Sequence, residues 1–272
     1  MTINCHGKLI DLTTPRVMGI LNITPNSFYD GGKYSSDKAI LLQVEKLLFD
    51  GATFIDIGAY SSKPDAEFVS EELEISRLLP VLKLVLKHFP KAIISIDTFR
   101  SHVARVGIDN GAALINDISA GRLDPLMMSV VAELQVPYIM MHMKGDPQTM
   151  QSMTDYSDII KELLFYFSQN VALARSKGIN DLVIDPGIGF AKTIEQNFEV
   201  LNNLDFFQML NLPILLGVSR KSMIYKTLES SAELALNGTT VLNTIGLQKG
   251  ANILRVHDVK EAIETIKLVG KL

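Results

Sequence analysis

Basic side chains occur in two places near the C-terminal end of the sequence. Arg220 and Lys221 follow one apolar run, and Arg255 and His257 follow the next. An arginine can bind two phosphate oxygens at once, a lysine supplies a point charge, and a histidine ring donates a hydrogen bond. Together these residue types predict a site for a phosphate-bearing small molecule. A solvated surface position explains Arg220 equally well.

Acidic and amide side chains stand at the ends of the other apolar runs. These polar residues are Asn22, Asp56, Asp97, Asn116, Asp117, His142 and Asp185. Any one of them could instead cap a helix or form a turn, because Asp and Asn are common in both places. A capping role, however, would not put the polar residue at the end of the run every time. The series therefore predicts a shared site rich in carboxylates and amides.

Short apolar runs, eight in all, are the elements that could position these residues. They are separated by amphipathic stretches too long for hairpins, a spacing typical of parallel β-α-β units. Most runs are apolar on both faces, as strands buried in a parallel sheet are. The predicted strands are Val17–Leu21, Thr53–Ile57, Ile93–Ile96, Ala113–Ile115, Tyr138–Met141, Leu182–Ile184, Pro213–Leu216 and Asn252–Val256.

Helical spacing of apolar residues fills the intervals between the runs. The clearest helix is Asp37–Asp50, whose apolar residues fall on one face. Another begins after Ser70, which reads as an N-cap followed by glutamates in the first turn, and Pro80 is expected to kink or restart it. The remaining predicted helices are Ser101–Asn110, Pro125–Leu134, Tyr156–Lys177, Thr193–Phe207, Ala232–Lys249 and Val259–Val269.

This alternation predicts an α/β fold, a (β/α)8 TIM barrel that forms one domain over residues 1–272. An open doubly wound sheet is the alternative, but the sequence lacks the GxGxxG motif of NAD-binding sheets. Residues Ile3–Leu12 are predicted to form a short β-hairpin beneath the barrel. In such barrels the site lies at the C-terminal ends of the strands, and the last two loops most often hold phosphate. The basic residues occupy those two loops.

Composition narrows the classes of partner. The net charge of -4 argues against nucleic acid, which requires clustered Lys and Arg. The one cysteine, Cys5, excludes an internal disulfide and a cysteine-based zinc site. The N-terminal residues lack the pattern of a signal peptide, and no apolar stretch approaches the roughly 20 residues of a membrane span. We expect a cytoplasmic protein with no membrane or nucleic-acid partner.

Long loops follow the first two predicted strands, over residues 22–36 and 58–70. The first holds Gly31-Gly32 and the second Ser61-Ser62-Lys63-Pro64. Glycine-bearing loops of this length at a barrel mouth predict lids that close over a substrate. Tolerated insertions are the alternative interpretation.

Motifs over most of the length resemble those of the dihydropteroate synthases, folate-pathway enzymes of the pterin-binding barrel group. The resemblance depends on NITPNSF, IDTFR, INDISAG, DPGIGF, GVSRKS and RVHDV, which occur in the family's order. It implies a transferase that joins 6-hydroxymethyl-7,8-dihydropterin diphosphate to p-aminobenzoate, releasing diphosphate and 7,8-dihydropteroate. It also implies help from Mg2+, a homodimer formed through outer helices, and a target for sulfonamides.

The resemblance assigns roles around the pterin diphosphate. The residues implied to bind it are Asn22, Asp97, Asn116, Asp185, Phe190, Lys221, Arg255 and His257. A carboxylate can accept the paired donors of the pterin's 2-amino-pyrimidinone edge. Asn22 is the implied Mg2+ contact, since a carboxamide oxygen suits a hard cation that keeps waters and substrate phosphates as ligands. The residues implied to act in catalysis are Asp30, Asp97, Lys221, Arg255 and His257.

The p-aminobenzoate contacts are implied in the same way. They are Phe28, Ser62, Lys63, Pro64 and Ser222. Asp30 matches a carboxylate that supports the positive charge developing on the pterin methylene. The second loop departs from the family's usual Thr-Arg-Pro-Gly, because Lys63 replaces the arginine and lacks its bidentate fork.

Two other functions compete with the synthase. A pterin-binding methyltransferase of the same barrel group would keep Asp97, Asn116 and Asp185 but would not need a diphosphate site. Lys221 and the Arg255-x-His257 motif favour the synthase. A catalytically inactive binding barrel would typically have lost the charged residues of its mouth.

Overall fold

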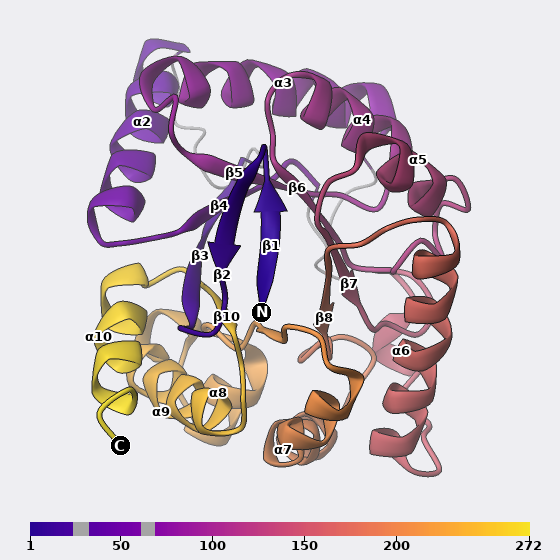
Figure 1. Ribbon diagram of the computed structural model, residues 1–272. Helices are drawn as coiled ribbons and strands as arrows, with labels where there is room; N and C mark the ends of the chain where they lie inside the picture. The colour runs from indigo at the N-terminus through magenta and orange to yellow at the C-terminus, as the bar shows by residue number, and fades with distance from the viewer. Residues whose placement is uncertain (24–32, 61–68) are drawn as a thin grey trace.

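The computed structural model describes residues 1–23, 33–60 and 69–272 as a barrel of strands inside a ring of helices (Figure 1). Its strands are β3 (Arg16–Asn22), β4 (Phe54–Gly58), β5 (Ile93–Asp97), β6 (Leu114–Asp117), β7 (Tyr138–Met141), β8 (Leu182–Asp185), β9 (Leu215–Leu216) and β10 (Ile253–Val256). They pair in parallel in the order β8-β7-β6-β5-β4-β3-β10-β9, and a parallel bridge between Ile184 and Ile214 joins the two ends. The predicted TIM barrel is confirmed.

The helices lie outside the barrel. They are α2 (Lys33–Phe49), α3 (Glu71–His88), α4 (Ser101–Asp109), α5 (Met127–Leu134), α6 (Ile159–Ser176), α7 (Ile194–Asn202), α8 (Ser222–Thr227), α9 (Leu236–Gln248) and α10 (Val259–Val269). Short 3-10 segments are η1 (Met150–Ser152), η2 (Leu204–Leu210) and η3 (Ala232–Leu234). Among the described residues, none of the helices has both the length and the apolar character that a membrane crossing needs.

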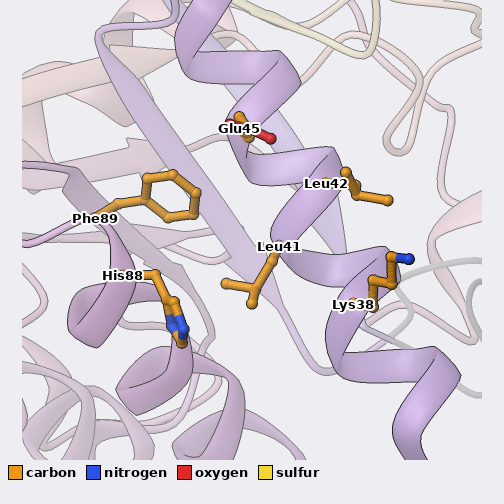
Figure 2. Close-up of a pocket in the computed structure, with 6 residues that line it drawn as sticks. All are labelled: Lys38, Leu41, Leu42, Glu45, His88 and Phe89. Carbon is orange, nitrogen blue, oxygen red and sulfur yellow. The ribbon is translucent and has the colours of Figure 1, made fainter.

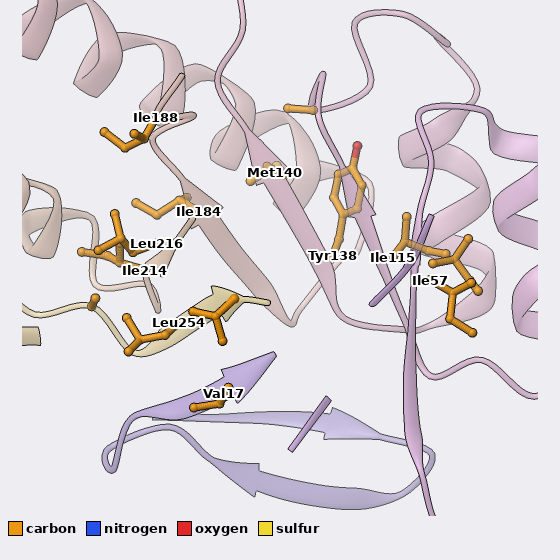
Figure 3. Packing of buried hydrophobic residues seen from close by; sticks show 14 of the residues in the cluster. Val17, Ile57, Ile115, Tyr138, Met140, Ile184, Ile188, Ile214, Leu216 and Leu254 are labelled. Carbon is orange, nitrogen blue, oxygen red and sulfur yellow. The ribbon is translucent and has the colours of Figure 1, made fainter. Parts of the chain in front are cut away.

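Two of the three hydrophobic clusters among the described residues hold the barrel together. The larger cluster fills the space between strands and helices, and Figure 3 shows part of it, from Val17 on β3 to Leu254 on β10. The smaller of these two clusters lies inside the barrel, where Met18, Phe54 and Leu114 meet residues of the N-terminal hairpin. Buried apolar area of this kind is the main source of folding free energy.

The predicted N-terminal hairpin is also confirmed. It consists of β1 (Thr2–Cys5) paired antiparallel with β2 (Lys8–Asp11). Its buried residues Ile3, Cys5 and Ile10 pack against the starts of the barrel strands. The hairpin therefore covers the end of the barrel opposite the strand C-termini, as Figure 1 shows.

Some predicted boundaries differ from the structure. The helix containing Pro80 continues without restarting, because Pro80 lies on the exposed face, where water can reach the carbonyl that its ring leaves unpaired. Strand β9 is shorter than predicted: Pro213 has no N–H, and the N–H of Ile214 donates to Asn252 Oδ1 at 2.9 Å. The predicted helix 193–207 is confirmed as far as Asn202 and wrong after it, because Leu204–Leu210 form the 3-10 segment η2.

Candidate active site

Four neighbouring strands align in one row at their C-terminal ends, and three of the four residues in this row are polar. The register aligns Asn22 on β3 with Gly58 on β4, Gly58 with Asp97 on β5, and Asp97 with Asn116 on β6. A Cβ at Gly58 would lie 3.6 Å from Asn22 Oδ1 and 3.5 Å from Asp97 Oδ2. Because Gly58 has no side chain, the space between the amide and the carboxylate stays open.

Arg255 joins two carboxylates in this mouth. Its Nε donates to Asp56 Oδ2 and its Nη2 to Asp97 Oδ2, each at 2.7 Å. Asn116 Nδ2 donates to the same Asp56 oxygen at 3.0 Å. Asp56 is completely buried, and its other oxygen has no hydrogen-bond partner among the described residues. The strand-end pattern identified Asp56 as polar but gave no sign of this partnership.

The electrostatics of the cluster follow from burial and the ion pairs. Burial alone would lower the pKa of Arg255, but Asp56 and Asp97 outweigh it and raise that pKa, so the guanidinium is permanently charged. Burial raises the pKa of Asp97 to about 7, although Arg255 opposes the change. Asp97 therefore takes up a proton more easily than an exposed carboxylate does.

A second group of residues forms the wall between β8 and β9. Asp185 ends β8, is buried, and accepts the N–H of Gly187 at 2.8 Å. Lys221 Nζ donates to the carbonyl of Ile188 and lies 4.8 Å from the centre of the Phe190 ring. Burial raises the pKa of Asp185 and lowers the pKa of Lys221 to about 8. A carboxylate, an ammonium and an aromatic face thus line one side of the mouth.

Lys192, which the sequence did not single out, supports the loop that carries this wall. Its buried amino group contacts Gly187 O at 2.9 Å, Phe190 O at 3.1 Å and His142 Nδ1 at 3.2 Å. Burial lowers the pKa of Lys192 to about 7, and these three contacts fix the position of its amino group. His142 was predicted as a polar strand end, but it is buried and faces Lys192.

The other candidate residues after β9 and β10 have different surroundings. Arg220 donates through Nε and Nη2 to both oxygens of Asp258, at 2.8 and 2.9 Å, and through Nη1 to the carbonyls of Ala232 and Glu233. Arg220 is therefore neither a phosphate ligand nor a solvated surface residue. His257 is exposed beyond the end of β10, and Ser222 begins α8.

Several predicted residues lie outside the described part of the chain: Phe28, Asp30, Ser62, Lys63 and Pro64.

The residues bordering the second undescribed segment are held by a buried ion pair. Arg100 pairs with Glu74, donates to Val69 O at 2.7 Å and lies 5.5 Å from the Tyr60 ring centre.

A surface groove of about 380 Å³ lies away from the mouth. It is formed by α2 and the end of α3 and lined by Lys38, Leu41, Leu42, Glu45, His88 and Phe89 (Figure 2). None of the residues predicted to do chemistry lines this groove. The strand ends, rather than the groove, define the candidate site.

A magnesium ion would find few protein ligands here. Within the described ranges, no group of three or more His, Cys, Asp and Glu side chains could hold a metal. Asn22 Oδ1, however, is an exposed hard oxygen donor beside the open space over Gly58. These residues fit an Mg2+ ion whose remaining ligands are waters and phosphate oxygens.

Known proteins resemble this chain over nearly all of its length. A family model described as "Pterin binding enzyme" matches residues 18–257. Dihydropteroate synthase of Bacillus subtilis (strain 168) is 41% identical over 255 residues, which cover 93% of this chain and 87% of that protein. Dihydropteroate synthase of Yersinia pestis, solved with a sulfonamide drug, has a TM-score of 0.93 and 36% identity, covering 100% of this chain and 98% of that chain. The enzyme of Xanthomonas albilineans, solved with 4-aminobenzoic acid, has a TM-score of 0.92 and 34% identity, covering 99% and 97%.

Proposed function

The chain belongs to the dihydropteroate synthases, a family of pterin binding enzymes, and we propose that the mouth of its barrel performs their transferase reaction. The substrates are 6-hydroxymethyl-7,8-dihydropterin diphosphate and p-aminobenzoate, and the products are 7,8-dihydropteroate and diphosphate, a step of folate biosynthesis. The assignment of residues rests on one observation, the two ion pairs that Arg255 forms with Asp56 and Asp97.

Recognition of the pterin requires acceptors for its amino and ring N–H groups. Asp97 and Asp185 are carboxylates at the ends of β5 and β8, and Asn116 between them carries an amide. Lys221 supplies a donor for the ring's acceptor atoms, and Phe190 supplies an apolar wall beside it. Buried polar groups of this kind give specificity, because a ligand that cannot pair with them leaves them unsatisfied.

The diphosphate gains negative charge as it leaves, so the protein must stabilise that charge. The arylamine nitrogen attacks the pterin methylene carbon, the carbon–oxygen bond breaks, the bonding pair leaves with the diphosphate, and the amine then loses a proton. Arg255 and His257 face the growing negative charge. Two unit charges ~4 Å apart interact by about 1 kcal/mol in water but about 4 kcal/mol at an effective dielectric of 20, so a mouth that excludes water strengthens these contacts.

Magnesium enters the proposal through Asn22. When bound, Mg2+ neutralises charge on the diphosphate oxygens. Asn22 Oδ1 would hold it at the end of β3, beside Gly58.

Chelation of divalent cations is expected to lower diphosphate release by about tenfold or more, and added Mg2+ to restore it. Asn22→Ala is expected to raise the Mg2+ concentration required for half-maximal rate. Asn180→Ala, which removes an exposed asparagine at the other end of the barrel, is the matched control. An Mg2+ titration of the three proteins measures the effect, and identical curves would contradict the role of Asn22.

The p-aminobenzoate site completes the proposal. Ser222 is the described residue assigned to its carboxylate, while Phe28, Ser62, Lys63, Pro64 and Asp30 keep their roles as predictions. The Xanthomonas albilineans and Yersinia pestis structures, which hold 4-aminobenzoic acid and a sulfonamide drug, support an arylamine site that sulfonamides also occupy. The homodimer and the cytoplasmic location also stay predictions.

The decisive assay is diphosphate release with both substrates. We expect release to depend on p-aminobenzoate and to be inhibited by a sulfonamide. A methyltransferase would release no diphosphate, and an inactive barrel would bind the pterin without turnover. Release that is the same with and without the arylamine would refute the proposed reaction.

A further inference from the structure

Ser219 and His257 form a hydrogen-bonded pair where β9 and β10 end. Ser219 is buried at 5% exposure, whereas His257 is exposed at the mouth. Ser219 Oγ lies 3.0 Å from Nδ1 of the ring and accepts the backbone N–H of His257 at 3.1 Å. Two contacts thus join the same two residues and fix the ring relative to the barrel.

The hydrogen-bond inventory of Ser219 determines which ring nitrogen carries the proton. A hydroxyl has one proton and two lone pairs, and the backbone N–H of His257 occupies one lone pair. If Nδ1 were protonated it would occupy the other, and the buried hydroxyl proton would have no acceptor among the described residues. Because a buried donor without an acceptor is costly, the hydroxyl donates to Nδ1. The ring proton is then on Nε2.

The carboxylate next in the chain does not take this orienting role. Asp258 follows His257 directly, and a carboxylate is a common partner of a histidine Nδ1–H. Here, however, both Asp258 oxygens accept from Arg220, at 2.8 and 2.9 Å. Ser219 is therefore the partner that orients His257.

We propose that Ser219 is a positioning residue that holds His257 as a neutral ring with its proton on Nε2, so that Nε2–H donates to an oxygen of the departing diphosphate. Only the identity of that acceptor rests on the proposed function.

The charges around the ring support this state. Contact of one side of the ring with Ser219 removes part of it from water and lowers the pKa of His257, the charges of Arg255, Arg220 and Lys221 add to the decrease, and Asp258 opposes it. At pH 7 the ring is thus neutral. Arg255 supplies the positive charge of this part of the mouth, and His257 supplies a hydrogen-bond donor of fixed orientation.

Nitrogen-15 NMR of the ligand-free enzyme tests the tautomer directly. The protein has five histidines, and the His257→Gln variant identifies the His257 signals by their loss. At pH 7.5 we expect a protonated Nε2 and an unprotonated Nδ1 in the wild-type protein, and a mixture of tautomers in Ser219→Ala. Protonation of Nδ1 in the wild-type protein would overturn the inference, and this measurement does not depend on the variant folding.

Kinetics test the consequence for the reaction. Ser219→Ala is expected to lower kcat about tenfold, because the variant lacks the hydrogen bond that orients the His257 ring. We expect no change in KM for p-aminobenzoate. Ser219→Thr keeps a hydroxyl and is expected to recover most of the rate. Ser176→Ala, which removes an exposed hydroxyl bonded to Leu173 O on α6, is the control and is expected to behave as wild type.

The outcomes separate the two proposals. A wild-type kcat for Ser219→Ala would overturn the positioning role. The expected tautomer in a protein that releases no diphosphate would instead refute the proposed function and leave the assignment of the ring proton intact.

Discussion

Arg255→Ala is expected to lower arylamine-dependent diphosphate release by at least about 10²- to 10³-fold and to reduce the free energy of unfolding by about 3–5 kcal/mol. The activity is lost because the guanidinium faces the leaving group. Stability is lost because Asp56, which is completely buried, loses the cation 2.7 Å away. Steady-state diphosphate release and urea denaturation measure the two effects.

A double variant separates the two effects of Arg255→Ala. Adding Asp56→Asn removes the buried charge that the single change leaves uncompensated, so most of the stability is expected to return while activity stays lost. Arg105→Ala is the matched control: it breaks an exposed pair with Glu133, and such pairs contribute at most about 1 kcal/mol. Turnover at the wild-type rate in a folded Arg255 variant would contradict the assignment.

Asp97→Asn is expected to weaken binding of a pterin analogue by about 10- to 100-fold while making the fold more stable at pH 8. A hydrogen bond to a charged group contributes about 1.5–3 kcal/mol, and the amide keeps one acceptor where the carboxylate has two. Arg255 keeps Asp56 as a partner in this variant, so no buried cation is left alone. Calorimetric titration measures the affinity.

The pH dependence of stability gives this variant a second test. Burial raises the pKa of Asp97 from 3.8 to about 7 in the folded protein. The contribution of Asp97 to the free energy of unfolding is therefore largest below pH 3.8, decreases as pH rises towards 7, and is lost above pH 7. Asparagine cannot ionise and escapes that loss. The variant's advantage should therefore be absent near pH 4, grow towards pH 7 and stay constant above it. Urea denaturation at pH 4, 6 and 8 measures it, with the exposed Asp205→Asn as control; a variant less stable than wild type at pH 8 would contradict the prediction.

The sequence predicted the barrel because apolar runs and helical spacing are local properties. It also predicted the polar ends of the strands, since parallel strands of a barrel finish at the same side. Asp97 and Asp185 end their strands as expected, and Asn116 is the residue before the last one of β6. The resemblance of the motifs to those of the dihydropteroate synthases then supplied the substrate.

Contacts between residues far apart in the sequence could not be predicted from local sequence patterns. Asp56 lies in the middle of β4, whereas Asp97 ends β5, and only the three-dimensional arrangement shows that Asp56 is a completely buried counter-ion of Arg255. Lys192 has no periodicity that would mark it, because its three acceptors come from a loop and from β7's end. Arg220 looked like a phosphate ligand by type, yet Asp258 satisfies it 38 residues away.

The hairpin of β1 and β2 limits how ligands reach the interior of the barrel. Ile3, Cys5 and Ile10 fill the end of the barrel at the starts of the strands, so substrates and products must use the opposite end. A ligand of Asp97 and Asp185, which end β5 and β8, must therefore enter and leave past the C-terminal ends of the strands.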